Sequence, residues 1–239
     1  MIIGISGKIG SGKDTVGQII QYLTTHPENL KVNPVYNQGF EYTMNYSKQK
    51  EGFPFHNSNW EIKKFAGKLK QIASMLTGAT LEQLEDQDFK KLDIGPDWGI
   101  TYRELLQKLG TEAMRNGLHT NVWVNALFAD YGKNVWDPTP NDFVEPNWII
   151  TDMRFPNEMD AVKARGGITI RVNRPKAKIS TGDSVTDFVL NETKNFGIVE
   201  HPSETALDNH NFDFVIDNNG SISDLIDKVK EILTLNNII

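Results

Sequence analysis

The hydrophobic positions at the start of the chain change their spacing within the first 23 residues. Residues 2–5 form a short β-branched run, whereas the apolar residues of 16–23 recur every three or four positions. The glycine-rich stretch GKIGSGK, residues 7–13, lies between them. This pattern predicts a strand, a tight loop and an amphipathic helix.

Similar patterns predict further strands and helices. The run from Trp148 to Asp152 has no polar alternation, which is typical of a strand buried on both faces of a parallel sheet. We predict strands over 60–65, 148–152, 168–172 and 212–216, and helices over 66–76, 80–92, 101–115, 122–131, 157–165 and 222–233. The last helix has a capping-box-like start at Ser221 and Asp224. Alternating strands and helices predict a parallel sheet with helices on both faces.

Three stretches interrupt this alternation. Residues 26–59 are polar and aromatic, and we predict an insertion there, with a small hairpin suggested by the alternation of Phe40, Tyr42 and Met44. Residues 132–146 are predicted to be an exposed loop, and residues 176–202 a lid. With no internal repeats, residues 1–239 are expected to form a single domain.

The glycine-rich loop carries a phosphate-binding motif. Gly7, Gly12 and Lys13 satisfy the pattern Gly-x4-Gly-Lys, in which backbone N–H groups and a helix N-terminus cradle phosphate oxygens. Its place between a strand and a helix favours this interpretation over a chance glycine turn. The Ser or Thr that normally ligates Mg²⁺ is replaced by Asp14, and Thr15 follows, so either residue could contact the metal. The predicted fold is therefore a three-layer α/β P-loop domain with a five-stranded parallel sheet.

Other candidate residues lie at strand ends and helix edges. Asp152 ends a buried strand, where a Walker-B-type acid could hold Mg²⁺ or its water; a turn or N-cap aspartate is the alternative. Arg154 follows it, Arg174 follows the next strand, and Arg103 lies on a helix edge. Guanidinium groups match phosphate oxygens in pairs, so these arginines favour a kinase of a phosphorylated small molecule.

Lys70 lies in an early helical turn, where a cation is unfavourable for the helix dipole. This position suggests that Lys70 binds phosphate, with a solvated lysine as the alternative.

Composition limits the partners and the compartment. The net charge is −6 and the pI is about 5.4, so we expect no general attraction to nucleic acid or to an anionic membrane. The absence of cysteine excludes disulfides, thiolate zinc sites and cysteine nucleophiles. No apolar run is long enough to span a membrane, and the first strand does not look like a signal peptide. We expect a cytoplasmic protein.

Several segments together resemble the bacteriophage-type deoxynucleoside monophosphate kinase family. They are SGKIGSGKDT, FAGKLKQIA, YRELLQKLGTE, TDMRFPNE, RVNRP and HPSE, in that order from residue 3 to about residue 233. GKDT and LGTE are the most specific, and GKDT accounts for Asp14. The resemblance implies transfer of phosphoryl from ATP to a deoxynucleoside monophosphate with Mg²⁺, in host cytoplasm if a phage encodes the chain.

The resemblance also implies roles for individual residues. Binding of the ATP phosphates falls to Gly7, Lys8, Ile9, Gly10, Ser11, Gly12, Lys13, Asp14 and Thr15, and metal binding to Asp14, Thr15 and Asp152. The acceptor or the transferring group is bound by Lys70, Arg103, Gln107, Asp152, Arg154 and Arg174, with Glu204 near a nucleotide. Lys13, Asp152 and Arg154 are the catalytic candidates. Trp123 either flanks the acceptor or packs in the core.

Two other functions are considered. One is a kinase of another small phosphorylated metabolite, such as a phosphomevalonate kinase-like enzyme, which has a related GKD loop. Such an enzyme would not phosphorylate deoxynucleoside monophosphates. A P-loop ATPase or switch is the second alternative, although the chain lacks an Asn-Lys-x-Asp guanine motif. The preferred bases and the oligomeric state, with a homodimer as one possibility, are left open.

Overall fold

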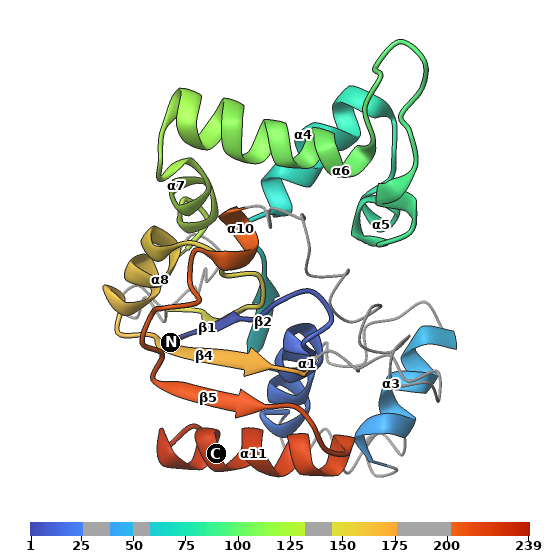
Figure 1. Cartoon of the computed structure of the whole chain (residues 1–239). Helices are drawn as coiled ribbons and strands as arrows, with labels where there is room; N and C mark the ends of the chain where they lie inside the picture. Colours follow the sequence, from blue (N-terminus) through green and yellow to red (C-terminus); the bar gives the residue numbers. More distant parts are fainter. Residues whose placement is uncertain (26–38, 50–57, 132–144, 176–201) are drawn as a thin grey trace, which may run out of the picture.

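The protein is built around a parallel β-sheet (Figure 1). A computed structural model describes residues 1–25, 39–49, 58–131, 145–175 and 202–239. The strands of the described part are β1 (Ile2–Ser6), β2 (Trp60–Lys63), β3 (Asn147–Ile150), β4 (Ile168–Asn173) and β5 (Phe214–Asp217). Their order is β2-β3-β1-β4-β5, and every neighbouring pair is parallel. The predicted five-stranded parallel sheet is confirmed.

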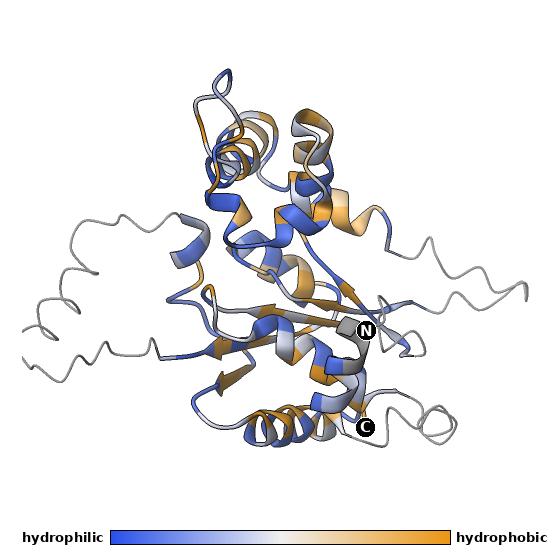
Figure 2. Cartoon of the chain, turned by 90° about the vertical axis from the view of Figure 1, so that its right-hand side faces the viewer, coloured by the Kyte–Doolittle hydropathy of each residue, from blue (hydrophilic) through white to orange (hydrophobic). Residues whose placement is uncertain are grey.

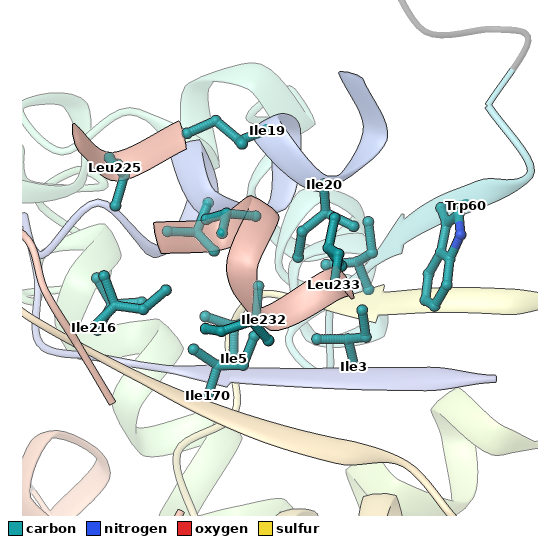
Figure 3. Packing of buried hydrophobic residues seen from close by; sticks show 14 of the residues in the cluster. Ile3, Ile5, Ile19, Ile20, Trp60, Ile170, Ile216, Leu225, Ile232 and Leu233 are labelled. Carbon is teal, nitrogen blue, oxygen red and sulfur yellow. The ribbon is translucent and has the colours of Figure 1, made fainter. Parts of the chain in front are cut away.

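The central strand β1 is buried on both faces, because helices cover each side of the sheet. Ile3 and Ile5 pack in a cluster with α1 (Lys13–Leu23) and α11 (Ile222–Leu235), as Figure 3 shows. Ile2 points to the other face, toward α7 (Val122–Phe128) and α8 (Pro156–Lys163). Figure 2 shows apolar strands, whereas α11 alternates between hydrophobic and hydrophilic residues. This is the expected three-layer α/β arrangement.

A second group of helices lies apart from the sheet, at the top of Figure 1. It comprises α4 (Gly67–Thr77), α5 (Leu81–Glu85), η2 (Phe89–Lys91), α6 (Tyr102–Gln107) and η3 (Lys108–Leu118). Ala73, Ala79, Leu84 and Leu105 form its own small apolar core. η3 continues α6 as a π-helix and ends with a hydrogen bond of 3.0 Å from the His119 N–H to the Met114 carbonyl.

Two predicted elements are wrong. Residues 40–44 are part of a helix, α3 (Phe40–Gln49), and not of a hairpin. Phe40 is buried edge-on to Tyr22, with ring centroids 5.7 Å apart, and the apolar positions of α3 follow helical spacing toward the core. The helix predicted over 80–92 is broken into α5 and η2, because an Asp86 carboxylate oxygen accepts the Phe89 N–H at 2.6 Å and turns the chain.

The predicted lid at 176–202 lies outside the described residues except for Pro202, which begins the short helix α10 (Pro202–Thr205). The remainder of the predicted insertion, at 26–38 and 50–57, and the loop residues 132–144 also lie outside them. The capping box predicted at Ser221 and Asp224 is confirmed.

Candidate functional site

The loop between β1 and α1 has a conformation that requires glycine. Gly10 and Gly12 have φ values of 79° and 95°, in the left-handed region, and Gly12 is the N-cap of α1. A Cβ at Gly7 would lie 2.6 Å from the Val172 carbonyl oxygen. The Ser11 N–H closes the loop by donating to the Lys8 carbonyl at 3.1 Å. The backbone can thus approach a ligand closely at the N-terminus of α1.

A cavity of about 370 Å³ lies between this loop and the second group of helices. Lys13 and Asp14 line it from the loop. Burial lowers the pKa of Lys13 below its usual value, and the nearby Asp14 carboxylate offsets part of that effect. The Thr151 hydroxyl donates to Asp14 Oδ1 at 2.9 Å, and Lys64 Nζ lies 3.6 Å from the same oxygen. Asp14 is therefore held at the cavity wall through Oδ1, and within the described ranges its Oδ2 has no hydrogen-bond donor.

The opposite wall carries several cations. Lys70 Nζ lies 2.5 Å from Glu85 Oε1, and its side chain is only 13% exposed, so the solvated-lysine alternative is wrong. Arg103 donates to the Gln87 side-chain oxygen at 3.1 Å. The pKa of Lys90 is lowered to about 8 by burial, with further contributions from Lys70 and Arg103. Lys70, Arg103 and Lys90 all line the cavity, and Glu85 lines it beside them.

Asp152 joins the sheet to α4. Its Oδ1 accepts the Phe65 N–H at 2.8 Å, and its Oδ2 accepts the Ala66 N–H at 2.9 Å. Ala66 is the N-cap of α4, so Asp152 caps that helix from another part of the chain. Asp152 lines the cavity, and both of its oxygens already have donors.

Arg154 lies beside Asp152 and pairs with an acid from α10. Its Nη1 forms an ion pair with Glu204 Oε1 and donates to the Ser203 carbonyl at 3.4 Å. Glu204 and Arg154 both line the cavity. Glu204 therefore lines the cavity as the partner of an arginine.

Trp123 is the one aromatic residue among the predicted site residues. Its indole N–H donates to the Gly110 carbonyl of η3 at 2.8 Å, and its ring is 5% exposed within the core cluster that covers one face of the sheet. Trp123 also lines the cavity. Trp123 is thus part of a core cluster and also borders the cavity.

Most of the predicted site residues meet in this one cavity. Those that line it are Ile9, Gly10, Lys13, Asp14, Lys70, Arg103, Gln107, Trp123, Asp152, Arg154 and Glu204. Gly7, Lys8, Ser11, Gly12 and Thr15 belong to the loop or to the first turn of α1 without lining the cavity. Arg174 is exposed just after β4 and does not line it either.

Sequence reasoning missed other charged residues of the cavity wall: Lys64, Glu85, Lys90, Arg115 and Glu158. Lys64 directly follows β2, a strand-end position like that of Arg154, which could have identified it. Lys90 lies in the segment 80–92, for which the sequence predicts only a helix. Nothing local to Glu158 indicates that its partner would be Arg115.

Comparison with known proteins identifies the family. A family model described as deoxynucleotide monophosphate kinase matches residues 56–229. The chain belongs to the deoxynucleotide monophosphate kinase family. It is 28% identical over 176 residues to a putative deoxynucleotide monophosphate kinase of Acanthamoeba polyphaga mimivirus, which covers 70% of this chain and 79% of the relative.

Two phage proteins called deoxynucleotide monophosphate kinase are also similar. The chain is 28% identical over 204 residues to that of Enterobacteria phage T4, covering 85% of this chain and 67% of the relative. It is 32% identical over 141 residues to that of Escherichia phage RB69, and the match covers 59% of this chain and 47% of the relative. The resemblance to the phage-type family is thus confirmed.

The family match extends over β2 to β5 and the second group of helices. It thus includes Lys70, Lys90 and Arg103, which form what we call the cation wall of the cavity. It begins at residue 56, so the phosphate loop of this deoxynucleotide monophosphate kinase family member is assigned from its own sequence and conformation. Among the described residues, no group of three or more His, Asp or Glu side chains could hold a metal ion. No helix in the described ranges is long and apolar enough to cross a bilayer.

Proposed function

We propose that the chain transfers the γ-phosphoryl group of ATP to the phosphate of a deoxynucleoside monophosphate, giving ADP and a deoxynucleoside diphosphate. The observation that carries this proposal is one cavity with Lys13 on one side and Lys70, Arg103 and Arg154 on the others. Phosphoryl transfer requires mainly positioning and charge stabilisation. A cavity lined by cations from both sides can hold two phosphate groups close together.

The phosphate loop is the proposed ATP site. Its N–H groups and the N-terminus of α1 favour the β- and γ-phosphates, and Lys13 supplies a positive charge beside them. Mg²⁺ is usually held by one or two carboxylates together with phosphates and water, so the absence of a three-ligand cluster in the described residues fits this metal. Asp14 and the Thr15 hydroxyl would hold Mg²⁺, which would supply positive charge to offset that of the phosphates.

Asp152 fits a metal site less well than Asp14, because each of its oxygens accepts a backbone N–H. We propose that its main contribution is to position the start of α4, which carries Lys70. Arg154 is proposed to stabilise charge on the transferring phosphoryl group.

The second group of helices is the proposed acceptor site. Lys70 and Arg103 would bind the acceptor phosphate, because a lysine and a planar guanidinium both match phosphate oxygens. Leu69, Leu106 and Trp123 give the cavity apolar surface suited to a base or a sugar. We propose that the binding partners are free nucleotides. A homodimer is a separate hypothesis, which sedimentation would test.

An ADP-release assay with ATP and Mg²⁺ tests the function. Each deoxynucleoside monophosphate, the matching ribonucleotides and a reaction without acceptor are compared. ADP release that depends on a deoxynucleotide is the expected result. Release that is the same without any acceptor would indicate an ATPase, and ATP binding without release for any nucleotide would favour a kinase of another phosphate ester.

A further inference from the structure

Glu85 is a carboxylate that lies among the lysines and the arginine of the cation wall. It is the last residue of α5, and its two oxygens contact different lysines. Oε1 lies 2.5 Å from Lys70 Nζ, and Oε2 lies 3.3 Å from Lys64 Nζ. All three side chains line the cavity, so Glu85 forms a bridge between two cations that face the ligand space.

The surroundings of this bridge have an excess of positive charge. Lys90 and Arg103 line the same wall, and the pKa of Lys90 is lowered first by burial and then by the charges of Lys70 and Arg103. Arg103 donates to Gln87, a neutral partner, which leaves its charge uncompensated by that contact. Glu85 therefore stands among four cationic side chains, of which Lys64 also lies 3.6 Å from the Asp14 carboxylate.

Glu85 itself is ionised at neutral pH. Burial raises its pKa, but the hydrogen bond from Lys70 and the charges of Lys70 and Lys64 outweigh that effect, and the net pKa is below its usual value. The side chain is still 47% exposed, so it is not locked into a packed core. A half-exposed anion held by lysines in a ligand cavity can be replaced by another anion.

We propose, building on the function proposed above, that Glu85 occupies the acceptor-phosphate position in the ligand-free protein and is displaced from Lys64 and Lys70 by the incoming phosphate. A nucleotide phosphate carries nearly two negative charges at neutral pH, and therefore competes well with a single carboxylate. Anions with a single charge compete less well with Glu85 for the two lysines. Glu85 thus competes with any incoming phosphate group and lowers the affinity of the cation wall for it.

The test compares Glu85→Gln with Glu82→Gln. Both changes remove one negative charge from α5, but Glu82 is exposed and does not line the cavity. Two quantities are measured at saturating ATP: the KM for the acceptor nucleotide and the inhibition constant for inorganic phosphate. We expect both to fall about three- to tenfold in Glu85→Gln, as Coulomb interactions over several ångströms predict, with a smaller change in Glu82→Gln.

An unchanged or higher KM and inhibition constant in Glu85→Gln would overturn the inference, as would an equal decrease in Glu82→Gln. Thermal unfolding of both variants checks that they are folded. Calorimetric titration with inorganic phosphate, without ATP, gives a second measurement that is independent of turnover, and binding must tighten in Glu85→Gln. If the wild type phosphorylates no nucleotide, the proposed function fails; if it does and these constants do not fall, only the role of Glu85 fails.

Discussion

Arg115 and Glu158 form an ion pair in the protein interior, with Nη2 and Oε1 2.6 Å apart and side chains that are 7% and 3% exposed. The second Glu158 oxygen accepts the Arg154 N–H at 2.7 Å and the Phe155 N–H at 3.1 Å at the start of α8. The Arg115 guanidinium lies 3.7 Å from the centre of the Phe155 ring. The pair therefore joins η3 of the helical group to α8 beside the sheet, at the cavity wall.

Replacing Arg115 with Met should destabilise the protein. Removing one partner of a buried ion pair costs about 3–5 kcal/mol, because the remaining charge is left uncompensated. Protonation of Glu158 relieves part of this, so we expect a loss near the lower end of that range. Denaturant unfolding measures it, with the exposed Arg174→Met as a control expected to change stability by about 0.5 kcal/mol or less. Similar stability of the two variants would contradict this account.

Glu158 should also make stability depend on pH. Burial raises its pKa from 4.5 to about 7, and the N–H of Arg154 and the charge of Arg115 offset only part of that shift. Between these two values the folded protein binds a proton that the unfolded chain does not. The contribution of Glu158 to the unfolding free energy therefore falls as pH rises from 4.5 to about 7, and is constant above.

The comparison variant for this pH effect is Glu158→Gln, which keeps a side-chain oxygen for the backbone donors but cannot titrate. Urea unfolding across the same pH window should show the wild type losing stability relative to the variant. Parallel pH profiles would mean that Glu158 has an ordinary pKa.

Replacing Lys13 with Met should nearly abolish phosphoryl transfer while the fold persists. Removal of one group that stabilises transition-state charge lowers kcat by about 10²- to 10³-fold. Burial of the Lys13 charge has a cost, so an apolar residue there should not lower the melting temperature. Lys68→Met is the matched control, because Lys68 pairs with Asp130 and does not line the cavity. Near-normal turnover of Lys13→Met would exclude the loop as the ATP site.

Asp152→Asn separates a structural role from metal binding. Asparagine offers one acceptor oxygen, so one of the two N–H groups of Phe65 and Ala66 would face an amide donor. An unsatisfied donor costs about 1–3 kcal/mol, and we expect a stability loss of that order. The Mg²⁺ concentration for half-maximal activity should stay the same. A large increase in that concentration without loss of stability would instead make Asp152 a metal ligand.

The sheet and the phosphate loop could be predicted because their signals are local. The apolar run of β1, the glycines at 10 and 12 and the helical spacing of α1 are all contained in a short segment. The hairpin predicted at 40–44 failed because alternation over five residues also fits one side of a helix, and packing of Phe40 against Tyr22 decides between them.

Much of the cavity wall could not be predicted, because it depends on tertiary contacts. Arg115 meets Glu158 only through the packing of η3 against the start of α8, and Asp152 meets Ala66 only through strand order. The exposure of a lysine is also hard to predict from sequence. A lysine in a polar helical segment is expected to be solvated, and only the tertiary structure shows that other cations lie around it.

Lys90 is that lysine, and it predicts how acceptor use depends on pH. Its pKa of about 8, lowered by burial and by Lys70 and Arg103, means that it loses its charge as pH rises through that value. A phosphate monoester with a second pKa of about 6 is already a dianion there, so attraction to the wall weakens. At saturating ATP, kcat/KM for the acceptor should fall above pH 8. Lys90→Met should have a lower kcat/KM at neutral pH and lack this fall, whereas Lys91→Met, whose exposed side chain pairs with Asp88, should keep the wild-type profile.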